Sequence, residues 1–235
     1  MIKNIFFDLD GTLLPMDQDK FTKGYFSRLV KRVAPLGYEP QRLIDSVWRG
    51  TAAMVKNTGH CTNEDAFWKE FQKIYCDKAT EDKPVFDDFY KTDFGNVKEN
   101  CGFNPKANET VKKLKADGFN LILATNPIFP SVATESRISW AGVDKNDFLI
   151  YTTYENSHYC KPNPKYYEEI LNKLNLKAEE SLMVGNDVEE DMIAETLGMQ
   201  VFLLTDCLIN KKDRDIAAYP SGSFDELYDY ISKNR

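Results

Sequence analysis

The stretch Ile5-Phe6-Phe7-Asp8-Leu9-Asp10-Gly11-Thr12-Leu13-Leu14 decides how this chain folds. Apolar residues run up to Phe7 and are followed by two carboxylates, Asp8 and Asp10. Because side chains two residues apart in a strand face the same side, both carboxylates would emerge together at the strand's C-terminal end. Open α/β sheets build their binding sites at that end. The alternative is a strand that ends in a polar turn, since Asp-Gly is a common turn pair.

The two carboxylates also indicate a kind of chemistry. At such close spacing they repel each other, so one would hold its proton longer than the other. A base or nucleophile would then lie beside an acid. A hard cation such as Mg2+ would relieve the repulsion and attract phosphate oxygens.

Size and composition limit the possible functions. A chain of 235 residues suits one large domain or a core with a smaller insertion. A net charge of −7 and a pI of 5.0 argue against nucleic-acid and anionic-membrane partners. The five cysteines are scattered and form no Cys-x-x-Cys pair, which favours reduced thiols over a zinc site or disulfides. No apolar run approaches membrane-spanning length, so we expect a cytoplasmic protein.

After the first strand, the chain changes character. From about residue 19 to 99, aromatic residues recur at three- and four-residue spacing, which predicts helices. Trp48-Arg49-Gly50 would interrupt one of these helices, because glycine lowers helix stability. Such a turn would direct Arg49 at a substrate anion, whereas the alternative is a solvated arginine on a helix surface. This helical block would sit as a lid over Asp8 and Asp10.

From Pro105 onward, strands alternate with helices. The expected helices span 106–117, 131–141, 164–174 and the stretch from the fourth strand to Leu197, and a last helix begins at Ser223 in a capping box with Glu226. The expected later strands span 119–124, 148–151, 182–184 and 201–204. This order predicts an α/β fold: a Rossmann-like parallel sheet core in three layers with an inserted all-helical cap. The core would comprise residues 1–15 and 100–235, and the cap residues 16–99.

Polar residues follow the strands of this predicted sheet. Taken singly, they could be turns, helix starts or a surface lysine. Together they supply carboxylates, a hydroxyl and a fixed cation at one edge, which favours phosphoryl transfer with a metal. They are Asp8, Asp10 and Thr12, then Thr125 and Asn126, then Lys161, and finally Asn186, Asp187 and Asp191.

In these motifs the chain resembles hydrolases of the haloacid dehalogenase superfamily that carry a helical cap after motif one. The resemblance covers nearly the full length. The matching motifs are Asp8-Leu9-Asp10-Gly11-Thr12, Thr125-Asn126, Lys161-Pro162-Asn163-Pro164 and Gly185-Asn186-Asp187-Val188-Glu189-Glu190-Asp191.

The resemblance implies a role for each motif residue. Asp8 would attack phosphorus, and Asp10 would protonate the leaving oxygen and then activate water. Thr125 and nearby backbone N–H groups would hold phosphoryl oxygens, while Lys161 would neutralise negative charge. The expected phosphate- and substrate-binding residues are Gly11, Thr12, Asn126 and Arg49.

Mg2+ is the cofactor that the resemblance implies, held by Asp8, the backbone carbonyl of Asp10 and a motif-four residue. The commoner family pattern has an acid directly after the glycine, where this chain has Asn186. We assign Asp187 as the direct ligand and Asp191 as an outer or water-mediated group. The register stays open by one residue, and Asn186 is the alternative ligand through its amide oxygen.

The resemblance also implies an activity. Family dehalogenases lack a second carboxylate at the position of Asp10, so its presence favours phosphate esters over halides. We expect a Mg2+-dependent phosphatase that acts on a small phosphorylated metabolite, as a monomer or weak dimer. A sugar-phosphate phosphomutase is the first alternative, and an inactive protein that binds a phosphorylated metabolite is the second.

Overall fold

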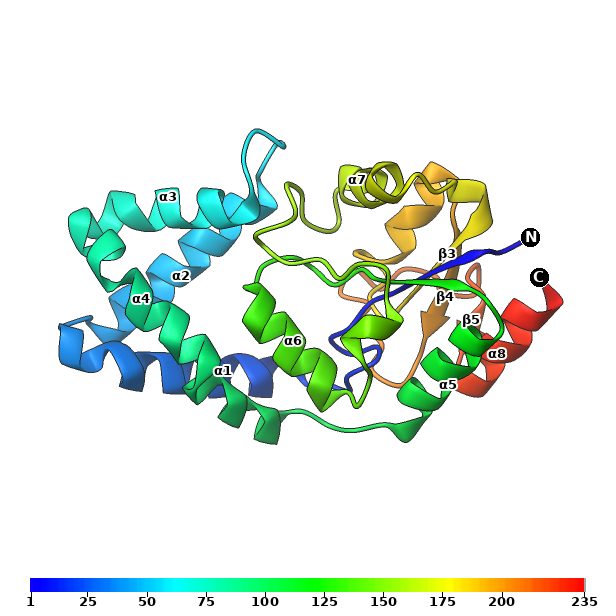
Figure 1. Cartoon of the computed structure of the whole chain (residues 1–235), viewed down its shortest axis with the longest axis horizontal. Helices are drawn as coiled ribbons and strands as arrows, with labels where there is room; N and C mark the ends of the chain where they lie inside the picture. The colour runs from blue at the N-terminus through cyan, green and yellow to red at the C-terminus, as the bar shows by residue number, and fades with distance from the viewer. Residues whose placement is uncertain (235) are drawn as a thin grey trace.

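The computed structural model describes residues 1–234 and contains a five-stranded parallel sheet in the order β2-β1-β3-β4-β5 (Figure 1). The first strand lies in the middle, where Phe7 pairs with Leu123 on one side and Val184 on the other. Since all the strands are parallel, their carboxyl ends meet at one edge of the sheet. The strands are β1 (Asn4–Phe7), β2 (Asn120–Leu123), β3 (Ser181–Gly185), β4 (Gln200–Leu204) and β5 (Ser221–Gly222).

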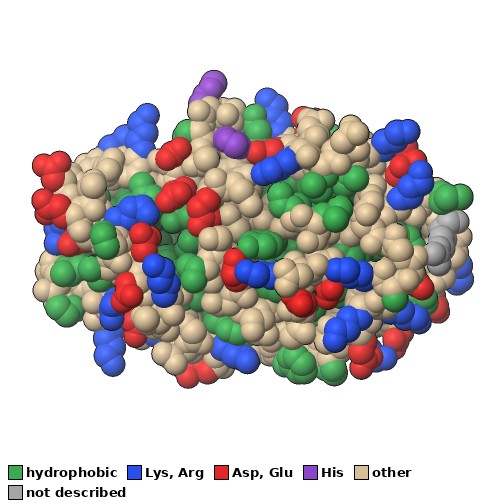
Figure 2. All heavy atoms as spheres, in the orientation of Figure 1, with side chains coloured by type: hydrophobic (Ala, Val, Ile, Leu, Met, Phe, Trp, Pro, Cys, Tyr) green, Lys and Arg blue, Asp and Glu red, His purple; other side chains and the backbone are tan. Residues whose placement is uncertain are grey.

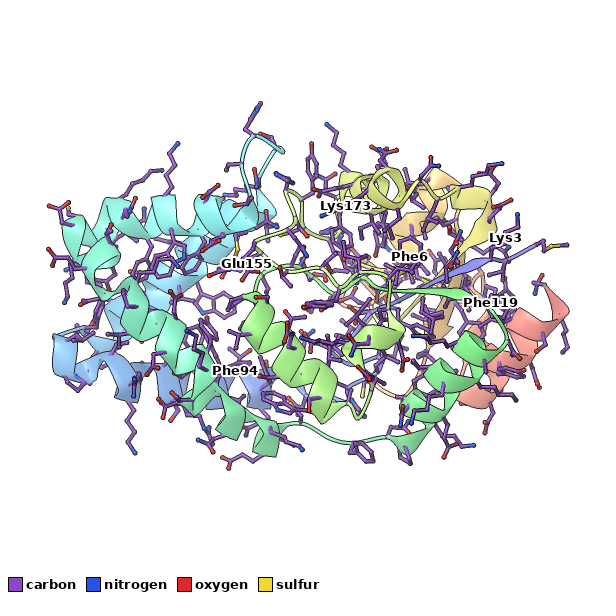
Figure 3. All side chains as sticks on the ribbon, in the orientation of Figure 1. Lys3, Phe6, Phe94, Phe119, Glu155 and Lys173 are labelled. Atoms are coloured by element: carbon purple, nitrogen blue, oxygen red, sulfur yellow. The ribbon has the colours of Figure 1, made fainter. Side chains whose placement is uncertain are left out.

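Alternate residues of β1 face opposite layers of helices, which completes the predicted three-layer core. Ile5 and Phe7 belong to the apolar cluster shared with α5 (Pro105–Ala116) and α8 (Phe224–Lys233). Phe6, labelled in Figure 3, belongs to the opposite cluster with α7 (Pro164–Leu174). All four β1 residues are buried, as expected for a central parallel strand covered on both faces.

The segment between β1 and α5 is all-helical, as predicted, and we call residues 16–99 the cap. Aromatic rings pack edge-to-face in its interior, with Phe71 and Phe86 at a centroid distance of 5.5 Å. Phe94, labelled in Figure 3, stacks on Trp140 of α6 (Ser131–Trp140) at 5.2 Å, so cap and core are in contact there. The cap elements are α1 (Gln18–Val33), η1 (Ala34–Leu36), α2 (Pro40–Val55), α3 (Asn63–Tyr75), α4 (Asp77–Lys91) and η2 (Asp93–Asn100), the last extending one residue beyond it.

Acidic and basic side chains are interspersed over the face shown in Figure 2, with hydrophobic side chains visible between them. Within residues 1–234, no helix is both long and apolar enough to cross a membrane.

Three predicted core helices are found within two residues of their expected ends, as α5, α6 and α7. The capping box of Ser223 and Glu226 is also confirmed at the start of α8. Residues 148–151, by contrast, do not form a strand of the sheet. They run beside β2 with a single bridge between Leu123 and Tyr151. Backbone hydrogen bonds from Leu149 to the Leu121 carbonyl at 2.8 Å and from Thr152 to the Leu123 carbonyl at 3.1 Å hold them there.

The helix expected after β3 is also different. Only a 3-10 helix, η5 (Met192–Leu197), forms there. The Asp187 side chain accepts hydrogen bonds from the backbone N–H groups of Glu189 and Glu190 at 2.8 and 3.0 Å. Because these bonds form a local turn, they compete with a helical start.

The predicted interruption at Trp48-Arg49-Gly50 is wrong, because α2 continues through these residues to Val55. A Cβ atom at Gly50 would lie 2.5 Å from the Phe67 ring of α3. The glycine therefore allows α2 and α3 to approach each other closely, and this packing outweighs its low helix propensity.

Candidate active site

A cavity of about 380 Å3 lies between the carboxyl edge of the sheet and the cap. Asp8 follows β1 directly and is held in the sheet by a 2.9 Å hydrogen bond from its backbone N–H to the Val184 carbonyl. The cavity therefore brings together the polar residues that follow three different strands. The predicted residues that line it are Asp8, Asp10, Thr125, Asn126, Asn186, Asp187 and Asp191.

Lys161 connects two of these carboxylates from below the cavity surface. Its Nζ lies 2.9 Å from Asp8 Oδ1 and 2.7 Å from Asp191 Oδ1, and its side chain is 1% exposed. Burial disfavours the charge, but the Asp191 and Asp8 carboxylates outweigh it and raise the pKa of Lys161 well above its ordinary value. Lys161 is therefore a fixed cation at the site.

Asp10 faces a buried arginine that the sequence did not single out. Its Oδ2 pairs with Nη1 of Arg137, from α6, while its Oδ1 is buried without a hydrogen-bond partner among residues 1–234. Arg137 is itself fixed by a 3.2 Å bond to Thr134 Oγ1 and by the Phe129 ring, whose centroid lies 4.7 Å from Cζ. Burial raises the pKa of Asp10 to about 6, although Arg137 opposes the shift. Asp10 can therefore exchange a proton close to neutral pH.

Gly11, Thr12 and Asn186 form a small network beside Asp8. The Thr12 hydroxyl donates to Asn186 Oδ1 at 2.9 Å, and Asn186 Nδ2 donates to the Cys207 carbonyl at 2.7 Å. These partners fix which end of the amide carries the oxygen. Gly11 has φ +89°, and a Cβ there would lie 2.4 Å from Asn186 Nδ2. A side chain at residue 11 would displace this amide.

The loop that follows β4 holds the motif-four segment in place. Ile209 accepts a backbone hydrogen bond from Val188 at 3.0 Å and donates one to the Asn186 carbonyl at 2.8 Å. Lys212 and Arg214 both pair with Glu189. No motif in the sequence indicates a purpose for this loop, whereas the structure makes it a support for the site.

Asp187 and Asp191 differ in how many of their oxygens are occupied. Asp191 uses Oδ1 for Lys161 and Oδ2 for the backbone N–H of Asp187, at 3.0 Å. Asp187 accepts two bonds at Oδ1, and its Oδ2 has no hydrogen bond within residues 1–234. Of the two carboxylates, Asp187 has the freer oxygen.

Thr125 and Asn126 are positioned through the backbone and through a further acid. The Thr125 carbonyl accepts hydrogen bonds from Thr152 Oγ1 at 2.6 Å and the Tyr166 hydroxyl at 2.8 Å. Asn126 Nδ2 donates to Glu190 Oε2 at 3.0 Å. Burial raises the pKa of Glu190 to about 7. Glu190 lines the cavity and was missed in the sequence because Glu-Glu at a helix start is unremarkable.

The available ligands for a metal are all oxygen atoms, which is the donor type that Mg2+ prefers. Asp8 Oδ2 and Asp187 Oδ2 carry no hydrogen bond within the described chain. No three His, Cys, Asp or Glu side chains of residues 1–234 converge as a metal site. A cation here would therefore also need the Asn186 amide oxygen or backbone carbonyls. With these additional oxygen atoms, the donors at the site fit a hard cation such as Mg2+.

Arg49 lies outside the cavity lining. Its Nη2 is 2.9 Å from Glu70 Oε1, and its side chain is 62% exposed.

Arg137, in contrast, is a site residue that the sequence could have indicated. It lies on the apolar stripe of α6 with Ala133 and Ile138, where an arginine needs a buried partner.

Comparisons with known proteins relate the chain to one family of hydrolases. The family model for haloacid dehalogenase-like hydrolases matches residues 2–194. The chain is 25% identical to glyceraldehyde 3-phosphate phosphatase of Methanothermobacter thermautotrophicus, over 92% of this chain and 90% of that protein. It is 28% identical to phosphoglycolate phosphatase of Vibrio parahaemolyticus, over 87% and 84%.

A solved structure shows a similar fold. The 2-haloacid dehalogenase of Pseudomonas syringae pv. Tomato superposes with a TM-score of 0.66 at 18% identity, covering 100% of both chains. From the family match, which spans most of the sequence, the chain belongs to the haloacid dehalogenase-like hydrolase family.

Proposed function

We propose that this hydrolase is a Mg2+-dependent phosphatase that cleaves a small phosphorylated metabolite through an aspartyl-phosphate on Asp8. The observation that carries the proposal is the placement of Asp8 at the cavity, with one oxygen fixed by Lys161 at 2.9 Å and the other free of hydrogen bonds in residues 1–234. A carboxylate held in this way is suited to nucleophilic attack. The two phosphatases to which the chain is similar support the same activity.

In the first step, Asp8 Oδ2 attacks phosphorus, and the bond between phosphorus and the ester oxygen breaks. Asp10 gives its proton to that oxygen, which leaves as an alcohol. The Lys161 ammonium stays beside Asp8 and offsets negative charge as the phosphoryl group arrives.

In the second step, water attacks the phosphorus of the aspartyl-phosphate, and Asp10 takes a proton from that water. The bond between phosphorus and Asp8 breaks, which releases inorganic phosphate and restores the carboxylate. Arg137 holds Asp10 by its Oδ2 and so limits the positions that this acid and base can take.

The residues that would hold the metal are Asp8, the backbone carbonyl of Asp10 and Asp187, with the amide oxygen of Asn186 as the alternative motif-four ligand. When bound, Mg2+ offsets the negative charge of the phosphoryl oxygens and of the nearby carboxylates. Asp191 has both oxygens occupied, so we assign it to the support of Lys161.

The test is hydrolysis of 4-nitrophenyl phosphate with and without Mg2+. We expect activity that requires the metal and that Asp8→Asn lowers by at least about 1,000-fold, since the nucleophile is lost. The matched control is Asp229→Asn, which makes the same change on the exposed side of α8. Activity retained in folded Asp8→Asn would overturn the nucleophile assignment.

A further inference from the structure

The cavity that begins at Asp8 extends into the cap, where its wall is apolar. Helices α1, α2, α3 and α4 all contribute aromatic rings to this wall, including Phe21, Phe26, Trp48, Phe67, Trp68 and Phe86. Polar side chains from the described part of the cap are few and uncharged, such as Thr22 and Thr51. The cavity therefore has a carboxylate-rich core end and an aromatic cap end.

Among the residues that the structure describes, the cap contributes no Lys or Arg to this lining. Several cap cations instead pair with acidic residues elsewhere: Arg28 with Glu99, Arg32 with Asp88, Arg49 with Glu70 and Lys83 with Asp87. The basic residue of the lining is Lys211, which belongs to the loop after β4. A second anionic group on a substrate that lies against the cap wall would thus receive no counter-charge from the cap, which is costly.

The mouth of the cavity also presents apolar side chains. Trp48 and Val55, which lie on either side of Thr51 along α2, are 50% and 43% exposed. The Trp48 ring packs on Phe26 at 5.5 Å, so it has a defined place rather than projecting freely. An ordered indole at the opening offers a flat contact surface for an apolar group.

We propose that the substrate is a phosphate monoester of an apolar alcohol, aromatic or branched alkyl, that carries no second phosphate or carboxylate. This inference rests on the proposed function and deepens it. The ester oxygen leaves as the alcohol with a proton, the oxygen of water joins phosphorus, and inorganic phosphate is released. The phosphate end binds at Asp8 and Lys161, and the apolar group fills the aromatic end.

The first experiment compares kcat/KM of the Mg2+-loaded enzyme for 1-naphthyl phosphate and for phosphoglycolate, which carries a carboxylate. We expect a preference of about 100-fold for the naphthyl ester, because the cap leaves the carboxylate unpaired. Equal or reversed preference would overturn the substrate inference while leaving phosphatase activity intact. If the enzyme hydrolyses none of the three compounds, 1-naphthyl phosphate, phosphoglycolate and 4-nitrophenyl phosphate, the proposed function itself is wrong.

Two variants test the cap wall directly. Trp48→Ala should lower kcat/KM for 1-naphthyl phosphate by about tenfold through loss of ring contact. Thr51→Arg should raise kcat/KM for phosphoglycolate by about tenfold, since it supplies the missing cation. The matched control is Phe103→Ala, which removes a 64% exposed ring that does not line the cavity. If neither variant changes the ratio between the two substrates relative to this control, the inference is wrong.

A measurement on the unaltered enzyme covers the case in which the variants do not fold. 1-Naphthol should inhibit hydrolysis of 4-nitrophenyl phosphate in competition with substrate, whereas glycolate at the same concentration should not. Stronger inhibition by glycolate would contradict an apolar binding site.

Discussion

Replacing Lys161 by Met gives the sharpest test of how the site is held together. The substitution keeps an unbranched apolar stem but removes the ammonium that lies 2.9 Å from Asp8 and 2.7 Å from Asp191. At an effective dielectric constant of about 20, each contact is worth about 6 kcal/mol of Coulomb attraction. The desolvation of the buried charges offsets much of this. Removing one member of such a buried set costs about 3–5 kcal/mol of folding free energy.

The assay is urea denaturation of metal-free protein, followed by circular dichroism, at pH 8 and pH 5. We expect Lys161→Met to lose about 3–5 kcal/mol at pH 8 and less at pH 5, where the stranded carboxylates can take up protons. Adding Asp191→Asn to Lys161→Met should recover at least about 1 kcal/mol at pH 8, because one stranded charge is removed.

The matched control is Lys165→Met on the exposed side of α7, which should change stability by less than about 0.5 kcal/mol. A loss in Lys161→Met that matches this control, or no recovery in the double variant, would refute the buried ion-pair network.

Three further predictions concern residues at the carboxylate-rich core end of the cavity. In metal-free protein, Glu190→Gln should gain stability over wild type as pH rises from about 4.5 to 7, by up to about 3 kcal/mol, in thermal unfolding. The variant gains relative to wild type because burial raises the pKa of Glu190 to about 7, so the folded wild type loses stability as this carboxyl ionises. Gly11→Ala should cost about 2–4 kcal/mol in urea denaturation, since it adds a clash with Asn186 to an unfavourable φ. Asp187→Asn should raise the Mg2+ concentration for half-maximal hydrolysis more than Asp191→Asn, which should instead lose more stability.

Each of these predictions has an outcome that would contradict it. A pH-independent difference between Glu190→Gln and wild type would mean that this carboxyl is not buried as described. Gly37→Ala is the control for Gly11→Ala, because Gly37 has φ +80° and a Cβ there would meet open space among residues 1–234. An equal loss in both glycine variants would exclude the clash. If Asp191→Asn raises the Mg2+ concentration for half-maximal hydrolysis more than Asp187→Asn does, Asp187 is not the direct motif-four ligand.

The sequence predicted most of the core because its information there is local. An apolar run ending in Asp8 and Asp10 indicated both a buried strand and a polar strand end. The parallel α/β order then brought Lys161 and the motif-four residues to the same edge. Family membership and the parallel sheet confirm the predicted fold.

The other parts of the site depend on contacts between distant segments, which no short sequence pattern indicates. An arginine on the apolar stripe of α6 can be noticed in the sequence, but its pairing with Asp10, more than a hundred residues away, is fixed only by the assembled fold. The loop after β4 supports Asn186 largely through backbone hydrogen bonds, which do not depend on side-chain identity. Gly50 was interpreted as a helix interruption, whereas its role is to admit the Phe67 ring. Such contacts become visible only when the elements are assembled.

The most direct test of the central claim is to trap the covalent intermediate on Asp8. Asp10→Asn should still release 4-nitrophenolate, a leaving group that needs little protonation, but should activate water poorly. With Mg2+ and 4-nitrophenyl phosphate, we expect a burst of about one nitrophenolate per chain and, after acid quench, one added phosphoryl group on the peptide that contains Asp8. A steady rate without a burst and an unmodified Asp8 peptide would contradict nucleophilic catalysis by Asp8.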